Sequence, residues 1–206
     1  MSGLSGFSDT FLAETTAILD AVDRSATERM ALALSRLRDD GGRLFILGVG
    51  GSAAHASHAV NDFRKICGLE AYAPTDNVSE LTARINDEGW ESSLSGWLRA
   101  SRLSRRDGVL VFSVGGGSLE RQVSTNLVSA LALARETGAH IYGIVGRQGG
   151  VTAQWAEEAV VIPPLFPERV TPHTEAVCAV LWHLLVSHPC LSLAGARWET
   201  LTGSGR

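Results

Sequence analysis

Short apolar runs of strand length alternate along this chain with longer segments that have helical spacing. The runs Leu44–Leu47 and Val109–Ser113 are too short for independent helices and are typical of buried strands. A strand, a helix and a second strand in succession form a crossover that leaves the two strands parallel. Repetition of this unit predicts an α/β fold in which helices cover both faces of a doubly wound parallel sheet.

The expected elements can be placed along the sequence. Two helices should fill the first forty residues, and Gly41-Gly42 should end the second one. Later helices are expected to begin near Ala53 and to cover Val78–Arg84, Glu91–Leu103, Thr125–Thr137 and Pro172–Ser187. The five expected strands are Leu44–Leu47, Glu70–Ala73, Val109–Ser113, His140–Val145 and Ala159–Ile162.

The chain is expected to form one domain, because no repeat, low-complexity tract or long linker divides its 206 residues. Residues 1–42 would be N-terminal helices for assembly, 43–188 the α/β core and 189–206 a tail. A net charge of −4 gives no reason to expect a nucleic-acid partner. The sequence lacks a signal-peptide pattern, a membrane-spanning apolar stretch and a disulfide framework among its three cysteines. We therefore expect a cytoplasmic protein without membrane contact.

Glycine-rich turns follow three of the expected strands. The first contains Gly50, Gly51 and Ser52, directly before a helix whose N-terminus offers free N–H groups to a phosphate. The second runs from Ser113 through Gly115, Gly116 and Gly117 to Ser118, and the third is Gly146–Gly150. The first turn lacks the Gly-x-Gly-x-x-Gly spacing of dinucleotide sites. A turn that is merely tight remains the alternative, but three such turns at one sheet edge favour a phosphorylated small molecule.

Histidines and carboxylates recur at helical spacing in two expected helices. His55, His58 and Asp62 share one face of the helix after Ser52, and Glu175 shares a face with His183 in the last helix. Imidazole and carboxylate groups from two helices make a credible site for zinc or another divalent metal, whereas hydrogen-bonded core histidines are the alternative. His173 and His188 are expected to be caps or surface residues, and Cys178 to pack as a small apolar residue.

The order and spacing of these motifs, from residue 8 to residue 188, resemble the SIS-domain phosphoheptose isomerases. The resemblance implies a flavodoxin-like fold, a homotetramer with active sites at subunit interfaces and a Zn²⁺ ion. It also implies interconversion of sedoheptulose 7-phosphate and D-glycero-D-manno-heptose 7-phosphate. The metal ligands would be His58, Asp62, Glu175 and His183. The sugar phosphate would contact Gly50, Gly51, Ser52, Asn86, Asp87, Ser113, Gly115, Gly116, Gly117, Ser118 and Glu175.

Isomerisation between an aldose and a ketose moves a proton between two carbons through an enediol, which requires a base and an acid. Asp62 and His183 are the candidates for this catalytic pair. The chain departs from the family pattern where Asp62 replaces a glutamate and Glu175 a glutamine. The second turn also lacks two hydroxyls, for which Arg121 or Ser124 could compensate.

Two other functions are compatible with the sequence. A SIS domain can also be a non-catalytic adaptor or sensor that binds a sugar phosphate, because fold does not fix function. The four candidate ligands together argue for an enzyme instead. An isomerase acting on a different sugar phosphate, such as arabinose 5-phosphate, is the third possibility.

Overall fold

The computed structural model describes residues 6–195 and contains a parallel sheet of five strands. Its order is β2-β1-β3-β4-β5. The strands are β1 (Leu44–Leu47), β2 (Ala71–Tyr72), β3 (Gly108–Ser113), β4 (His140–Val145) and β5 (Glu158–Val161). This is the doubly wound, flavodoxin-like order, so the predicted fold class is confirmed. The order reverses between β1 and β3, and the crevice at such a point is where ligands bind in open α/β sheets.

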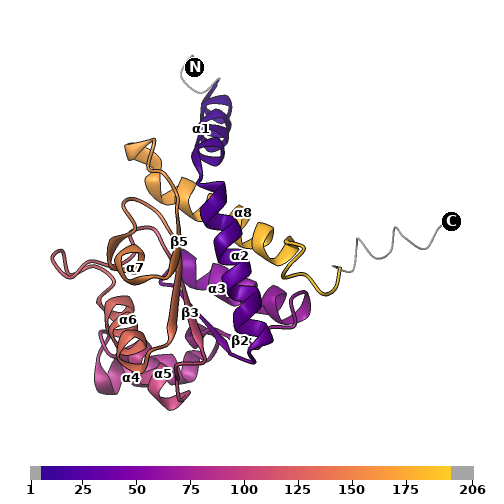
Figure 1. Ribbon diagram of the computed structural model, residues 1–206. Helices are drawn as coiled ribbons and strands as arrows, with labels where there is room; N and C mark the ends of the chain where they lie inside the picture. The colour runs from indigo at the N-terminus through magenta and orange to yellow at the C-terminus, as the bar shows by residue number, and fades with distance from the viewer. Residues whose placement is uncertain (1–5, 196–206) are drawn as a thin grey trace.

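Helices cover both faces of the sheet (Figure 1). On one face lie α2 (Arg24–Asp39), α3 (Gly51–Lys65) and α8 (Val170–Ser187); on the other lie α5 (Ser93–Ala100), α6 (Thr125–Thr137) and α7 (Gly150–Trp155). Alternate residues of each strand point to opposite faces, which divides the core in two. Leu44 and Ile46 pack with the first group of helices, whereas Phe45 and Leu47 pack with the second.

The N-terminal helix α1 (Phe7–Ala21) projects from the body of the molecule and contacts α8 (Figure 1). Glu14 is its buried polar residue and accepts hydrogen bonds from Arg169 Nε at 2.7 Å and from His173 Nε2 at 2.8 Å. The hydrogen bond from Arg169 is the main cause that lowers the pKa of Glu14 to about 2. His173 is only 1% exposed, so its expected place at the surface was wrong. The carboxylate that pairs with His173 belongs to Glu14 on α1, which is far away in the sequence.

Several boundaries differ from those expected. Helix α4 (Val78–Glu88) is four residues longer than predicted and includes Asn86 and Asp87, which had been expected in the connection after it. Strand β2 is shorter than predicted, and α7 was not predicted at all. Two short 3₁₀ helices, η1 (Pro74–Asp76) and η2 (Pro167–Arg169), precede α4 and α8. The limits of α6 and β4 agree with the prediction.

The predicted tail 189–206 lies outside the described residues from position 196 onward. Within residues 6–195, no helix is both long enough and apolar enough to cross a membrane.

Candidate functional site

The first glycine turn joins β1 to α3 at the carboxyl edge of the sheet. Gly50 has φ 62° and ψ −128°, a backbone conformation open essentially to glycine, and no side chain caps the helix that it precedes. Ser52 lies buried in the first turn of α3. The free N–H groups and the positive end of the helix dipole are therefore available to an anion at this edge.

Glu175, in the first half of α8, lies beside this turn. A Cβ atom on Gly51 would be 2.7 Å from Glu175 Oε1, so the Glu175 carboxylate lies directly against the backbone of this turn. The carboxylate does not join the group formed by His58, Asp62 and His183. Glu175 is therefore positioned beside the phosphate-type turn, and its role as a metal ligand remains a prediction that this geometry does not support.

The second and third glycine turns pack directly on each other. Gly116 has φ 70°, and a Cβ atom there would lie 1.8 Å from the carbonyl oxygen of Gly149. Thr152 Oγ1 donates to the Gly116 carbonyl at 2.8 Å. The Ser113 hydroxyl accepts from the N–H groups of Gly116 at 3.0 Å and Gly115 at 3.4 Å. These two N–H groups, which had been expected to face a phosphate, thus bond within the turn.

Arg147, in the third turn, was not singled out from the sequence. Its side chain passes along the second turn, with Cδ 3.9 Å from a Cβ atom built on Gly115. It is exposed and forms no ion pair with any of residues 6–195. An arginine within a glycine-rich turn at the sheet edge was the signal that could have identified it.

The segment from Ser118 to Val123, which follows Gly117, forms a turn held by its own hydrogen bonds. Ser118 and Val123 exchange two backbone hydrogen bonds, and the Ser118 hydroxyl accepts from the N–H of Arg121 at 3.1 Å. Ser124 has φ 53° and begins α6 without a side-chain capping bond. The hydroxyls of Ser118 and Ser124 therefore keep their protons available as donors near the N-terminus of α6.

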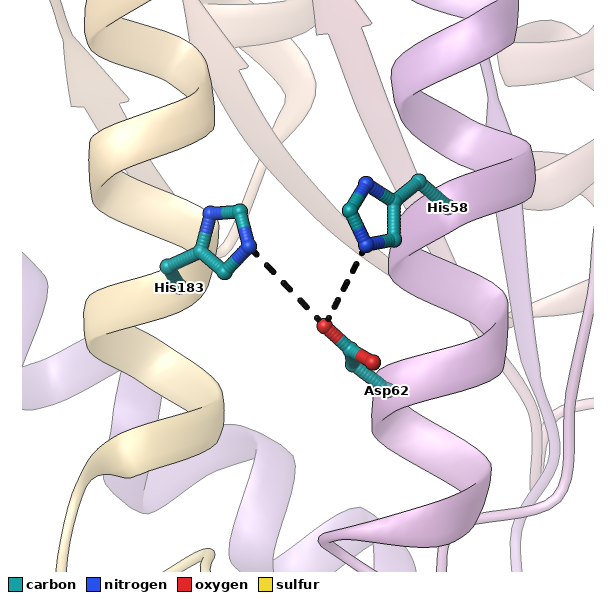
Figure 2. Close-up of side chains that lie close together, drawn as sticks. All are labelled: His58, Asp62 and His183. Carbon is teal, nitrogen blue, oxygen red and sulfur yellow. Dashed lines mark ion pairs between the residues drawn. The ribbon is translucent and has the colours of Figure 1, made fainter. Parts of the chain in front are cut away.

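The histidine–aspartate group lies farther along α3 and α8, which run side by side in the same direction. His58 and Asp62 project from α3 toward His183 on α8 (Figure 2). Asp62 Oδ2 is 3.7 Å from His58 Nε2 and 3.9 Å from His183 Nε2, and the three candidate ligand atoms all lie within 4.8 Å of one another. His55 does not belong to this group.

Neighbouring groups orient these three side chains. Asn61 Nδ2 donates to Asp62 Oδ1 at 2.8 Å, which leaves Oδ2 to face the imidazoles. His183 Nδ1 lies 2.7 Å from the carbonyl oxygen of Ala179, so the proton is assigned to Nδ1 and the lone pair to Nε2. Trp182, fully buried, stacks on the His183 ring at 3.5 Å and meets His58 edge-on at 4.7 Å.

The donor set fits a divalent cation. Zinc binds nitrogen and oxygen at about 2.1 Å, so neighbouring ligands in a tetrahedral site are about 3.4 Å apart. The separations of 3.7 and 3.9 Å around Asp62 Oδ2 are too long for hydrogen bonds but close to this value. Two imidazoles and one carboxylate with an open fourth position are the ligand pattern of catalytic zinc sites. His58, Asp62 and His183 could therefore hold a metal ion.

Asn86 and Asp87 are exposed in the last turn of α4. Asn86 Nδ2 donates to Asp87 Oδ1 at 2.7 Å, and neither side chain joins the histidine–aspartate group. Helix α4 has no buried residue. Helix α4 packs mainly against α5 and η1, and the role of Asn86 and Asp87 in sugar binding stays a prediction.

Proteins similar to this chain match it over most of its length. It is 32% identical over 183 residues to a phosphoheptose isomerase of Paramagnetospirillum magneticum, covering 85% of this chain and 86% of the relative. It is 31% identical over 159 residues to the lincomycin biosynthesis protein LmbN of Streptomyces lincolnensis, covering 72% of this chain but 56% of that protein. The structure of phosphoheptose isomerase GmhA from Neisseria gonorrhoeae superposes with a TM-score of 0.76 at 25% identity, covering 89% of this chain and 97% of that one. No protein-family model matches the chain.

Proposed function

This chain belongs to the phosphoheptose isomerase family, whose members are sugar-phosphate isomerases, and on that premise we propose that it converts sedoheptulose 7-phosphate into D-glycero-D-manno-heptose 7-phosphate. One observation carries the proposal: His58, Asp62 and His183 converge on one point from two helices that both begin at the glycine-turn edge. An adaptor that only binds a sugar phosphate needs no such convergence of a base and two imidazoles.

The separation of the two parts of the site supports a long substrate. His58 lies seven residues beyond Gly51, about 10 Å along the axis of α3. A phosphate at the glycine turns and a reacting carbonyl at the histidine–aspartate group would thus be held at opposite ends of an extended sugar chain. Glu175, between them on α8, can accept hydrogen bonds from sugar hydroxyls.

We assign the proton transfers to Asp62 and His183. Asp62 takes a proton from the carbon next to the carbonyl and returns it to the neighbouring carbon through an enediol. His183 exchanges a proton with the adjacent oxygens. A divalent cation, when bound by these residues and His58, supplies Lewis-acid polarisation of those oxygens. We propose Zn²⁺ as that cation, on the basis of the nitrogen-rich donor set.

The phosphate site proposed here uses hydroxyls together with a positive charge. Ser52, Ser113 and Ser118 remain the hydroxyl candidates, and Arg147 supplies a guanidinium beside the second turn. A guanidinium matches the geometry of a phosphate through two parallel hydrogen bonds. Arg147 would therefore offset the hydroxyls that this turn lacks relative to the family pattern.

We further propose that a neighbouring subunit completes the site in a homotetramer. The exposed α4 supports this, because Asn86 and Asp87 are available on its surface while Val78 leaves an apolar side chain 68% exposed. The cytoplasmic location expected from the sequence belongs to the same proposal, which the three free cysteines support.

The decisive experiment is incubation of the metal-loaded protein with sedoheptulose 7-phosphate in heavy water. We expect aldose heptose 7-phosphate with deuterium at C2, because Asp62 exchanges its proton with solvent between abstraction and return. Asp62→Asn, matched in size, is the control and should form aldose about 10²- to 10⁴-fold more slowly. Binding of the sugar phosphate without aldose or deuterium in the wild-type protein would overturn the isomerase assignment and favour the adaptor.

A further inference from the structure

A further histidine-centred group, outside the proposed active site, lies just after the end of α8. Cys190 Sγ is 2.9 Å from His188 Nδ1, and His188 Nε2 is 2.9 Å from Glu28 Oε2 on α2. The three side chains thus form a line of thiol, imidazole and carboxylate. The order is that of sites in which a histidine activates a cysteine and a carboxylate orients the histidine.

The hydrogen bonds assign the tautomer of His188. The backbone N–H of Cys190 also points at Nδ1, at 3.3 Å, so Nδ1 is the acceptor and Nε2 carries the proton donated to Glu28. The lone pair of Nδ1 therefore faces the thiol. A proton that moves from Sγ to Nδ1 produces an imidazolium whose charge Glu28 stabilises.

Arg38 on α2 holds the backbone around Cys190. Arg38 donates to the carbonyl oxygens of Leu191 at 2.8 Å and Cys190 at 3.3 Å, while its Nε pairs with Asp39 Oδ1 at 2.9 Å. Arg38 also reaches the carbonyl of Cys67 at 3.5 Å, and the neutral Cys67 thiol is a further titratable neighbour. This arginine therefore fixes the position of the segment that carries Cys190.

The other two cysteines provide an internal contrast. Cys67 and Cys178 are 0% and 4% exposed, and burial raises the pKa of each thiol to about 12. Cys178 packs as the small apolar residue expected from the sequence. Cys190, by comparison, is only partly buried and has an imidazole partner. Of the three thiols, Cys190 is thus the one that is both partly exposed and paired with an imidazole.

We propose that Cys190, activated by His188 and Glu28, is a modification site that exchanges with small-molecule disulfides. The thiol proton passes to His188 Nδ1, and the thiolate attacks one sulfur of the disulfide. A new sulfur–sulfur bond forms to Cys190 as the old one breaks, and the second half leaves as a thiolate. That leaving thiolate takes up the proton released by His188 or by solvent. The product is a mixed disulfide that another thiol can reverse.

The test measures the rate at which the full-length protein releases nitrothiobenzoate from dithiobis-nitrobenzoate, with peptide mass spectrometry to locate the label. We expect the label on Cys190, and Cys190→Ser should remove the fast reaction. His188→Asn keeps a polar group near Cys190 but removes the base. A less basic thiolate is more abundant at low pH but less nucleophilic. Near pH 6 the wild-type protein should therefore react about tenfold faster than His188→Asn, whereas near pH 8.5 the two rates should be similar.

Glu28→Gln provides a second variant that should preserve the fold, because the Glu28 side chain is 61% exposed. It should show the same pH-dependent loss with a smaller amplitude. A wild-type to His188→Asn ratio that stays constant with pH would mean that accessibility alone sets the rate, and would overturn the proposal. A fast reaction that persists in Cys190→Ser would overturn it as well. Neither outcome depends on the proposed isomerase activity.

Discussion

Two groups of histidine and carboxylate side chains connect α8 to a neighbouring helix, and they differ in how tightly they close. In the first, Glu14 on α1 accepts hydrogen bonds of 2.7 and 2.8 Å from Arg169 and His173, and His173 is 1% exposed. In the second, His58 and His183 are 58% and 50% exposed and lie 3.7 and 3.9 Å from Asp62.

The difference shows how similar residues serve opposite purposes. The first group satisfies its hydrogen-bonding atoms internally and excludes water, so it fastens α1 to the body of the molecule. The second group directs nitrogen and oxygen lone pairs at a shared space and leaves them unsatisfied by one another. A buried, closed group stabilises the fold, whereas an exposed, open one can accept a cation or a proton.

The largest expected effect tests the open group. Asp62→Asn should lower kcat for the proposed isomerisation about 10²- to 10⁴-fold, because the amide cannot act as a base. The melting temperature of the metal-free protein should change little, since within residues 6–195 the Asp62 side chain accepts a hydrogen bond only from its neighbour Asn61. Steady-state kinetics and thermal unfolding measure the two effects. A large loss of stability with retained kcat would reverse the roles assigned to the two groups.

Metal removal comes next. Chelation should lower the melting temperature of the wild-type protein by about 5 to 10 °C if the metal had been present at about a hundred times its Kd. His183→Ala should show no such shift, because one of the three ligands is missing. Differential scanning calorimetry with and without chelator measures both. Equal shifts in the two proteins would place the metal elsewhere.

Replacement of His173 by alanine tests the closed group. The variant loses a buried hydrogen bond to Glu14 and the stacking of the imidazole on Phe11, so its melting temperature should fall by on the order of 5 °C. His58→Ala, measured without metal, is the matched control and should unfold near the wild-type temperature because its imidazole is exposed. Equal falls in melting temperature for His173→Ala and His58→Ala would contradict the distinction between the closed and the open group.

The smallest expected effect is a change of folding stability at acidic pH. The pKa of Glu14 is lowered to about 2 in the folded protein, chiefly by Arg169, so its ionised form stabilises the fold above about pH 4.5. This contribution is lost as the pH falls toward 2. Glu14→Gln lacks it, so the stabilities of the variant and the wild-type should converge over that window. Urea unfolding at several pH values measures this, and two parallel curves would contradict the role of Glu14.

The sequence predicted the limits of β4 and α6 because a buried apolar strand and a helix ended by a glycine both have local sequence signatures. It also identified His58, Asp62 and His183. Glu175 stays a prediction as a metal ligand, and the geometry does not support it, since residues eight apart share a helix face but lie about 12 Å apart along the axis. Helix α7 was missed because six residues starting at a glycine carry no clear helical period.

The burial of His173 could not have been predicted locally, because its partner Glu14 lies 159 residues away in the sequence. Arg147 was not predicted as a site residue for a similar reason. Its relevance depends on the third turn packing against the second, which only the folded chain reveals.

The stacking of Trp182 on His183 gives the protein a built-in optical reporter. The indole contacts one imidazole face to face at 3.5 Å and another edge to face at 4.7 Å. Any change in charge on these rings alters the electric field across a fluorophore that water cannot reach. In a variant that keeps Trp182 as its only tryptophan, emission from this indole should therefore change when the site is occupied.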